Sequence, residues 1–520
     1  MAGRYSELLI EIGCEEMPAS WLPVITSNFV AVLESRLTQA RIVCETPINT
    51  FSTPRRFGVW TERMHDRQAE LEEMITGPPM SASFDADGSP RAAAIGFARK
   101  QGVQVSDLDC VKTTKGEYLA YNRRQQGKDT IDVLPGVLAD ALRNINFPKQ
   151  MHWDAVIDDG HGEFVFGRPI RWLVFLFSGR VVPFEINRSE GADTTGVQRV
   201  RSGAVTYGHR FFCRTGEPGV ALSVDSYESY KSTLADAYVL IDREKRRDRI
   251  ASKLKRCADK VGGIVAPLGR GSALLDEVPD LVEYPAVVTG SFPKEFLSLP
   301  DEVLSTTMIH HQHYFPVIDQ DGELKANFLA VTNTPRDNVA RIARNSERVL
   351  VARLRDARFF WEGDRAHRLD DRLDRLDTLL FHKKLGSYRD KSMRIALLSS
   401  KIVGDVLGQT DAVEHVERAA LLSKTDLATD MVGEFPELQG VMGGIYAREQ
   451  GEPEEVWKAI YYHYLPVGIQ PDTPPIRHDL GVANVTWAAL SIADKIDTVV
   501  GLFGVGEKPT GSRDPLGIRR

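Results

Sequence analysis

The stretch from Glu417 to Tyr446, ERAALLSKTDLATDMVGEFPELQGVMGGIY, determines how the C-terminal part of the chain folds. Apolar residues recur in its first half at three- and four-residue spacing, which predicts a helix with one buried face. This spacing places Lys424 and Asp426 inside the helix. Gly433 and Pro436 then end it, and the glycines of GVMGG allow neighbouring backbones to approach closely.

Two later segments are predicted to pack against this stretch. Ala459–Pro466 carries His463, and Asn484–Phe503 carries Asp494. In the second segment an apolar stripe follows one side of the predicted helix, while Leu490 and Asp494 fall on the opposite side. We therefore expect this helix to be buried all round, and we expect Asp494 to have a partner there.

Composition limits the class of protein. A chain of 520 residues is too long for one core, and its net charge of −7 gives no overall nucleic-acid signature, so any such contact must come from local basic patches. The five cysteines are scattered without a CxxC pair, which indicates reduced thiols. With no signal peptide and no apolar run near the roughly 20 residues of a membrane span, we expect a cytoplasmic protein.

The order of predicted strands and helices indicates an α+β multidomain protein. Strand-like and helical patterns alternate first, and a long all-helical region follows. We expect a mixed α/β body interrupted by a small inserted module, then a helical connector and an all-α domain. The expected boundaries are 1–62 and 160–335 for the body, 63–159 for the insert, 336–400 for the connector and 401–520 for the all-α domain.

The clearest basic pattern lies in the predicted helix Arg341–Trp361. Its apolar residues cover one side, and Arg341, Arg344, Arg348 and Arg355 fall within a narrow arc on the other. Such a stripe suits a polyphosphate backbone, because each guanidinium can fork onto a pair of oxygens. A solvated helix face, or a face that docks an acidic partner subunit, is the alternative interpretation.

Two shorter basic pairs are further candidates for nucleic-acid contact. Arg55 and Arg56 follow a turn and are placed to grip a phosphate, with a solvated strand end as the alternative. Arg99 and Lys100 end a short helix of the insert, with simple packing of that helix as the alternative.

Several long motifs carry a family resemblance. They are LLIEIGCEEMP, FSTPRRFGV, HHQHYFPV, ERVLVARLRDARFFWEGD, FHKKLGSYRDK, KTDLATDMVGEFPELQGVMG, HYLP and ADKIDTVVGLFGVGEKPTGSRDP. In this order, over nearly all of the chain, they resemble the beta subunit of the bacterial heterotetrameric glycyl-tRNA synthetase. The chain itself shows no adenylate-forming motif, which agrees with the division of labour in that family.

The resemblance implies a tRNA-binding subunit of glycine–tRNA ligase that does not adenylate glycine. The alpha subunit would hold glycine, ATP and Mg²⁺, so this chain would bind no cofactor, supply no catalytic residue and be inactive alone. Its partners would be the alpha subunit, in an α2β2 assembly, and tRNA-Gly. The basic residues named above then become candidate tRNA contacts.

The C-terminal blocks also resemble, loosely, the helical HD-type metal phosphohydrolases. Such enzymes hold a cation with a His, an adjacent His-Asp pair and a distant Asp. Here Lys424-Thr425-Asp426 takes the place of the His-Asp pair, and a lysine repels a metal ion. We expect Lys424, Asp426, His463 and Asp494 to form a vestigial, metal-free site. A phosphohydrolase acting on a nucleotide or an RNA end is the alternative function.

The last residues predict a helix that has barely begun. Asp514 suits an N-cap and Pro515 the first helical position, yet the sequence stops about one turn later. We expect a chain truncated before a C-terminal anticodon-binding domain, which beta subunits of the resembled family carry.

Overall fold

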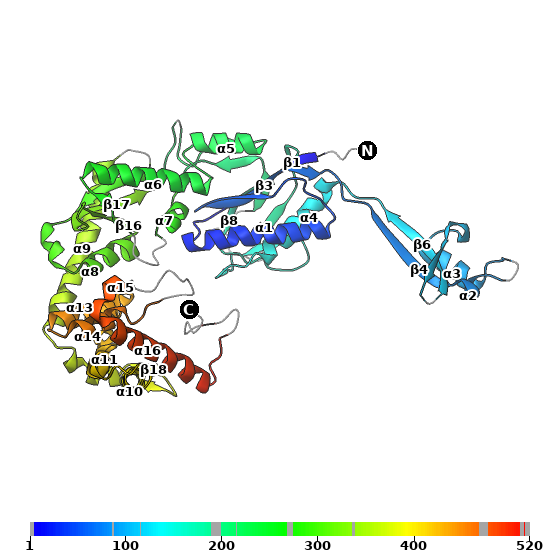
Figure 1. Ribbon diagram of the computed structural model, residues 1–520. Coiled ribbons are helices and arrows are strands. Elements are labelled where there is room, and N and C mark those ends of the chain that lie inside the picture. The colour runs from blue at the N-terminus through cyan, green and yellow to red at the C-terminus, as the bar shows by residue number, and fades with distance from the viewer. Residues whose placement is uncertain are drawn as a thin grey trace. The chain divides into compact units, whose positions relative to one another are not determined.

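The computed structural model describes residues 5–85, 88–114, 116–188, 199–214, 216–267, 274–334, 338–466, 477–509 and 514. Its helices and sheets confirm the α+β class (Figure 1). The helix expected beyond Asp514 lies outside the described residues. The chain divides into two compact units. The first comprises Met1–Ile250, Leu275–Ala286 and Thr332–Pro335; the second comprises Ala251–Leu274, Val287–Val331 and Arg336–Arg520.

The first unit is built on a sheet that has β1 (Tyr5–Cys14) as one of its interior strands. Its described strands run in the order β2-β3-β1-β8-β11-β10-β7, with β9 paired to β8. β1 is antiparallel to both of its neighbours. The other strands are β2 (Asn49–Thr53), β3 (Arg56–His65), β7 (Ala155–Ile157), β8 (Ile170–Phe177), β9 (Arg180–Val181), β10 (Glu185–Arg188) and β11 (Val200–Gly203).

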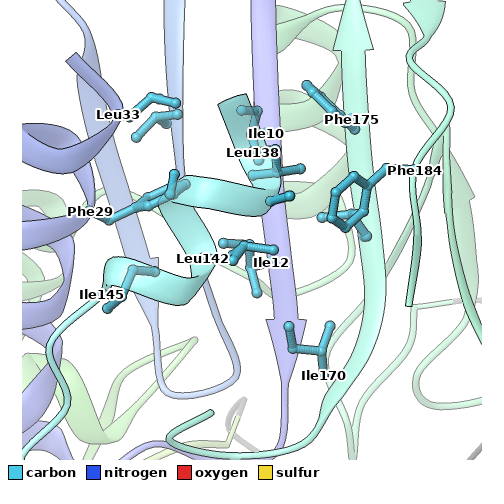
Figure 2. Close-up of a cluster of buried hydrophobic side chains, with 14 of the residues drawn as sticks. Ile10, Ile12, Phe29, Leu33, Leu138, Leu142, Ile145, Ile170, Phe175 and Phe184 are labelled. Carbon is cyan, nitrogen blue, oxygen red and sulfur yellow. The ribbon is translucent and has the colours of Figure 1, made fainter. Parts of the chain in front are cut away.

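Alternate side chains of a strand point to opposite faces of the sheet. Helices cover both faces of this sheet. Helices α1 (Leu22–Gln39) and α4 (Thr130–Asn144) pack on the face that carries Ile10 and Ile12, as Figure 2 shows. On the other face Leu9 packs with residues of α5 (Tyr227–Asp236). The remaining elements of this unit include β12 (Val205–Tyr207), β13 (Ala221–Ser223), the N-terminal part of α6 (Arg243–Lys260) and, apart from its first residue, α7 (Leu274–Glu277).

The insert is smaller than expected. It consists of a sheet in the order β4-β6-β5 with two short helices packed on it (Figure 1). Helix α4, expected within the insert, instead packs on α1 in the core of the body because its apolar face contributes Leu138 and Leu142. The elements of the insert are β4 (Leu71–Pro79), α2 (Met80–Ser83), α3 (Ala92–Gln101), β5 (Asp109–Thr113) and β6 (Gly116–Gln125).

The second unit joins a small sheet to the C-terminal helices. The sheet has the order β14-β16-β17-β15. Its Phe328 and Val288 share one core with Leu350 of α9 and with the later helices. These strands therefore belong to the second unit, whereas the expected boundary at 335 had assigned them to the body. The strands are β14 (Ile264–Val265), β15 (Ala286–Ser291), β16 (Tyr314–Ile318) and β17 (Leu324–Thr332).

The helices of the second unit follow the expected all-helical pattern. Before and among them lie the short helix α8 (Asp301–Thr306) and the small hairpin of β18 (Leu380–His382) and β19 (Gly386–Ser387). The long helices are α9 (Val339–Arg365), α10 (Tyr388–Lys401), α11 (Val413–Leu422), α13 (Val441–Glu449), α14 (Glu454–Tyr462) and α16 (Asn484–Gly504), with the shorter α12 (Asp430–Glu434) and α15 (Arg477–Leu480) between them. Among the described residues, none of the helices has the length and apolar character needed to cross a membrane.

Two expectations about these helices are wrong. Helix α11 ends at Leu422, so Lys424 and Asp426 lie in the tight turn that follows rather than inside the helix. Helix α16 buries Leu490 and Asp494 but exposes Ile496 and Phe503, so it is not buried all round. Its neighbours α10 and α14 cover only the side that carries Asp494.

Candidate nucleic-acid interface and a buried charged cluster

Helix α9 presents the predicted arginine stripe to solvent. Arg341, Arg344, Arg348 and Arg355, here called the α9 arginine face, are all exposed. On its other side the helix buries Leu350, Leu354, Ala357 and Trp361 in the core of the second unit. The predicted helix and its two faces are therefore confirmed, and packing of the apolar side fixes the direction in which the guanidinium groups point.

The arginine face borders an open hollow of about 720 Å³. Arg344, Arg348 and Arg355 line it. The hollow also contains one acid, Glu347, which accepts hydrogen bonds from the backbone N–H and the hydroxyl of Ser291 at 2.9 and 3.1 Å. This carboxylate is thereby held by the last residue of β15 and forms no ion pair with an arginine of the face.

The four arginines differ from other arginines of the same helix in their pairing. Arg353 lies 3.6 Å from Glu434, and Arg358 lies 3.6 Å from Glu295. Within the described part of the chain, no carboxylate forms an ion pair with any member of the arginine face. Guanidinium groups one or two turns apart on one helix face can each donate two parallel hydrogen bonds to a phosphate.

Arg56 has a structural position instead. Its side chain is fully buried, with Nη1 donating to Glu11 at 3.0 Å and Nη2 3.2 Å from Glu283. Burial lowers the pKa of Arg56, but the two carboxylates outweigh that effect and hold it above its ordinary value. A fully enclosed guanidinium offers no surface to a nucleic-acid phosphate, so Arg56 is not a candidate contact.

The remaining basic candidates stay accessible. Arg55 is half-buried beside Arg56. Arg99 and Lys100 are exposed in the last turn of α3, which ends in a left-handed Gly102 with φ of 74°. These three residues belong to the first unit, whereas the arginine face belongs to the second. Within the first unit, Arg99 and Lys100 lie in the insert and Arg55 lies at the end of the body sheet.

The predicted vestigial site is a buried charged cluster in the second unit. Lys424 Nζ lies 2.8 Å from His463 Nε2 and donates to Asp494 Oδ2 at 2.7 Å. The same ammonium lies 4.0 Å from the centre of the Tyr464 ring. Asp426, the fourth predicted member, accepts hydrogen bonds from the backbone of Gly440 and Gly443 instead. Three of the four predicted residues therefore meet.

Hydrogen bonds fix the protonation of this cluster. His463 Nδ1 lies 2.6 Å from the carbonyl oxygen of Ile460, which requires a proton on Nδ1 and leaves Nε2 to accept from Lys424. Burial, and then the charge of Lys424, lower the pKa of His463 to about 3. Burial raises the pKa of Asp494, but Lys424 and Lys391 together hold it well below its usual range. The cluster is thus a neutral imidazole, a carboxylate and ammonium groups.

This donor set does not fit a divalent cation. His463 and Asp494 offer two donor atoms, and the ammonium of Lys424 already lies within hydrogen-bond distance of both. A catalytic metal needs about three protein ligands, and an ammonium among them repels it. Among the described residues, no group of three His, Cys, Asp or Glu side chains is placed to hold a metal ion.

Sequence reasoning missed several members of the cluster. Lys391 of α10 lies 2.9 Å from Asp494 and 3.1 Å from Asp497, and it donates to Thr498 at 2.7 Å. Lys495 donates to three consecutive carbonyls that begin at His463. The signal was that Lys391 lies within FHKKLGSYRDK and Lys495 within ADKIDTVVGLFGVGEKPTGSRDP, two of the blocks that carry the family resemblance.

Acid is expected to destabilise the chain through His463. The unfolded chain protonates this residue near pH 6.5 and the folded chain only near pH 3, so between these values the unfolded state binds one proton more. Stability should therefore fall by about 1.4 kcal/mol per pH unit below pH 6 relative to a His463→Gln chain. The comparison removes the opposing effect of Asp426, whose burial raises its pKa to about 6. Urea unfolding midpoints of both chains from pH 7 to pH 4 test this, and parallel curves would refute it.

Comparison with known proteins places the chain in a family. The family model described as glycyl-tRNA synthetase beta subunit matches residues 8–520. The glycine–tRNA ligase beta subunit of Syntrophotalea carbinolica is 41% identical over 515 residues, which cover 99% of this chain and 70% of the relative. That of Bacillus subtilis is 38% identical over 518 residues, covering 99% of this chain and 70% of the relative. The chain belongs to the glycyl-tRNA synthetase beta subunit family, and the resemblance seen in the sequence is confirmed.

Proposed function

We propose that this chain is the tRNA-binding subunit of glycine–tRNA ligase and supports ATP-dependent attachment of glycine to tRNA-Gly. The observation that carries the proposal is the α9 arginine face on a member of this family. Four exposed guanidinium groups occur together without a carboxylate partner among the described residues. An RNA backbone satisfies such a row of cations, because each phosphate presents a pair of oxygens.

In this proposal the adenylation chemistry belongs to a partner alpha subunit. The sequence carries no adenylate-forming motif, so ATP, Mg²⁺ and glycine bind to the alpha subunit in a cytoplasmic α2β2 assembly. Arg99 and Lys100 of the insert and Arg55 of the body supply further phosphate contacts. This chain then contributes tRNA binding and no catalytic residue.

We also propose that helices α10 to α16 form an HD-like domain without hydrolytic activity. Lys424 lies between His463 and Asp494, where such an enzyme holds its cation, and a fixed ammonium cannot activate water as a metal does. The buried cluster therefore stabilises the helical domain, and its residues do not favour the phosphohydrolase alternative.

Pyrophosphate exchange is the direct test of the division of labour. With glycine and ATP, the purified chain alone is expected to give no exchange above background. The alpha subunit should give exchange, and mixing it with this chain or with an arginine-face variant should give the same exchange, because the face contacts tRNA and not ATP. Exchange by this chain free of any alpha subunit would overturn the proposal. Charging of tRNA-Gly should require both subunits.

A further inference from the structure

Two adjoining open hollows in the first unit share Arg55 and Arg210 in their walls. The larger, of about 330 Å³, is also lined by Arg171, Trp172 and Tyr207. The smaller, of about 120 Å³, is lined in addition by Phe211 and by three acidic residues, Glu16, Asp280 and Glu283. We call the two together the arginine–aromatic hollow. Its combination of guanidinium groups and aromatic rings is the chemistry that binds unpaired nucleotides.

The backbone holds the walls of this hollow in place. Arg55 lies in the turn between β2 and β3, and its carbonyl accepts a hydrogen bond from the N–H of Cys14 at 2.8 Å. Trp172 in β8 lies opposite Gly13 in β1. A Cβ at Gly13 would lie 1.9 Å from the Trp172 ring, so the glycine provides the space in which the indole packs. The site is therefore largely preformed.

The charge of the larger hollow is one-sided. It contains three guanidinium groups and no carboxylate among its lining residues. Arg55 lies 5.4 Å from the centre of the Trp172 ring, and its Nε is buried without an acceptor. An anion that entered the hollow would supply the acceptor that the described part of the chain does not give this nitrogen.

The other two arginines have exchangeable partners. Arg171 donates to Glu15 at 2.7 Å and Arg210 to Glu16 at 3.1 Å, both on the protein surface. Exposed ion pairs of this kind contribute little free energy, about 1 kcal/mol or less. A phosphate can therefore compete for both guanidinium groups, which keep further N–H donors.

The smaller hollow adds a surface for stacking. Phe211 is 58% exposed, and the guanidinium of Arg210 lies 5.5 Å from the centre of its ring. A large exposed aromatic side chain beside an arginine is a platform on which a nucleobase can stack, whatever its identity. A phosphate site and a stacking surface thus lie on two sides of one arginine.

We propose that the arginine–aromatic hollow binds one unpaired nucleotide of an RNA strand. Arg55, Arg171 and Arg210 hold its phosphate, and its base stacks on Phe211. The inference rests on the proposed function for the nature of the ligand, but its residues belong to the first unit and include no member of the α9 arginine face.

The test uses the full chain and a fluorescein-labelled single-stranded hexa-adenylate RNA, with binding measured by fluorescence anisotropy. Arg55→Ala combined with Arg210→Ala is expected to weaken binding by about tenfold or more and to reduce the salt slope by about 0.7 for each lost phosphate contact. Phe211→Ala should weaken binding at least about fivefold. Glu15→Gln should tighten it, because it releases Arg171, and a damaged fold cannot produce that gain.

Arg201→Ala is the matched control. Arg201 is exposed and donates to Glu185 at 2.7 Å, like Arg171 to Glu15, but it lies outside the hollow. Hexamer binding unchanged by the Arg55, Arg210 and Phe211 variants would overturn the inference. If Arg344→Glu with Arg348→Glu still weakened tRNA binding, the proposed function would survive that failure. Displacement of the hexamer by adenosine monophosphate at equal concentration would also overturn the inference, because the hollow would then be a site for a free nucleotide.

Discussion

Reversing the charges of Arg344 and Arg348 together is expected to weaken tRNA binding by on the order of ten- to a hundredfold at about 0.1 M salt. Both side chains are exposed and line the open hollow beside α9. Each reversal removes a phosphate contact and adds a repelling carboxylate. The slope of log affinity against log salt should fall by roughly one for each lost contact. Filter binding of labelled tRNA-Gly at several salt concentrations measures both quantities.

The chain offers close controls for this experiment. Arg353 and Arg365 lie on the same helix but pair with Glu434 and Glu449. Reversing these two makes the same change in net charge and should alter tRNA affinity less than about threefold, because long-range charge is screened over roughly 10 Å. Arg344→Lys with Arg348→Lys should retain most of the salt dependence. If both double charge reversals weakened tRNA binding equally, α9 would act only through net charge.

The second large effect is expected from replacing Lys424 by Met, which should destabilise the helical part of the second unit by about 3–5 kcal/mol. The change leaves His463 Nε2 without its donor and removes one of the two ammonium groups that neutralise Asp494. Removing one partner of a buried pair leaves an uncompensated charge in a region that water does not reach. Hydrogen exchange of the amides of α14 and α16 measures this local loss.

A second substitution distinguishes charge from packing. Adding Asp494→Leu to Lys424→Met removes both charges, and Lys391 keeps Asp497 and Thr498 as partners. The double variant should therefore be more stable than Lys424→Met alone. Lys458→Met is the control, because its pair with Glu454 has the same 2.7 Å length at a more exposed place. It should cost about 1 kcal/mol or less. A double variant less stable than the single one would contradict this account of the cluster.

Periodicity was enough to predict the elements that carry these effects. In α9, the three-and-four spacing of Leu350, Leu354, Ala357 and Trp361 placed the arginines on the opposite side, as the structure has them. The short apolar run at the N-terminus predicted β1 in the same way. Both depend on local repeats, which a single sequence displays directly.

Contacts between distant residues were not predictable in this way. Arg56 looked like an accessible basic residue, but Glu283, 227 positions later, encloses it together with Glu11. Lys391 joins the buried cluster from 103 positions before Asp494. The sequence pattern of α16 likewise indicated two apolar sides without indicating that its neighbours cover only one of them.

The central claim is that the α9 arginine face contacts tRNA. The most direct measurement replaces Arg344 with a photoreactive benzophenone amino acid and irradiates the chain reconstituted with alpha subunit and tRNA-Gly. The account predicts a covalent adduct with tRNA, lost when excess unlabelled tRNA is added before irradiation. A crosslink to the alpha subunit that is insensitive to tRNA would contradict it and would make α9 a subunit interface.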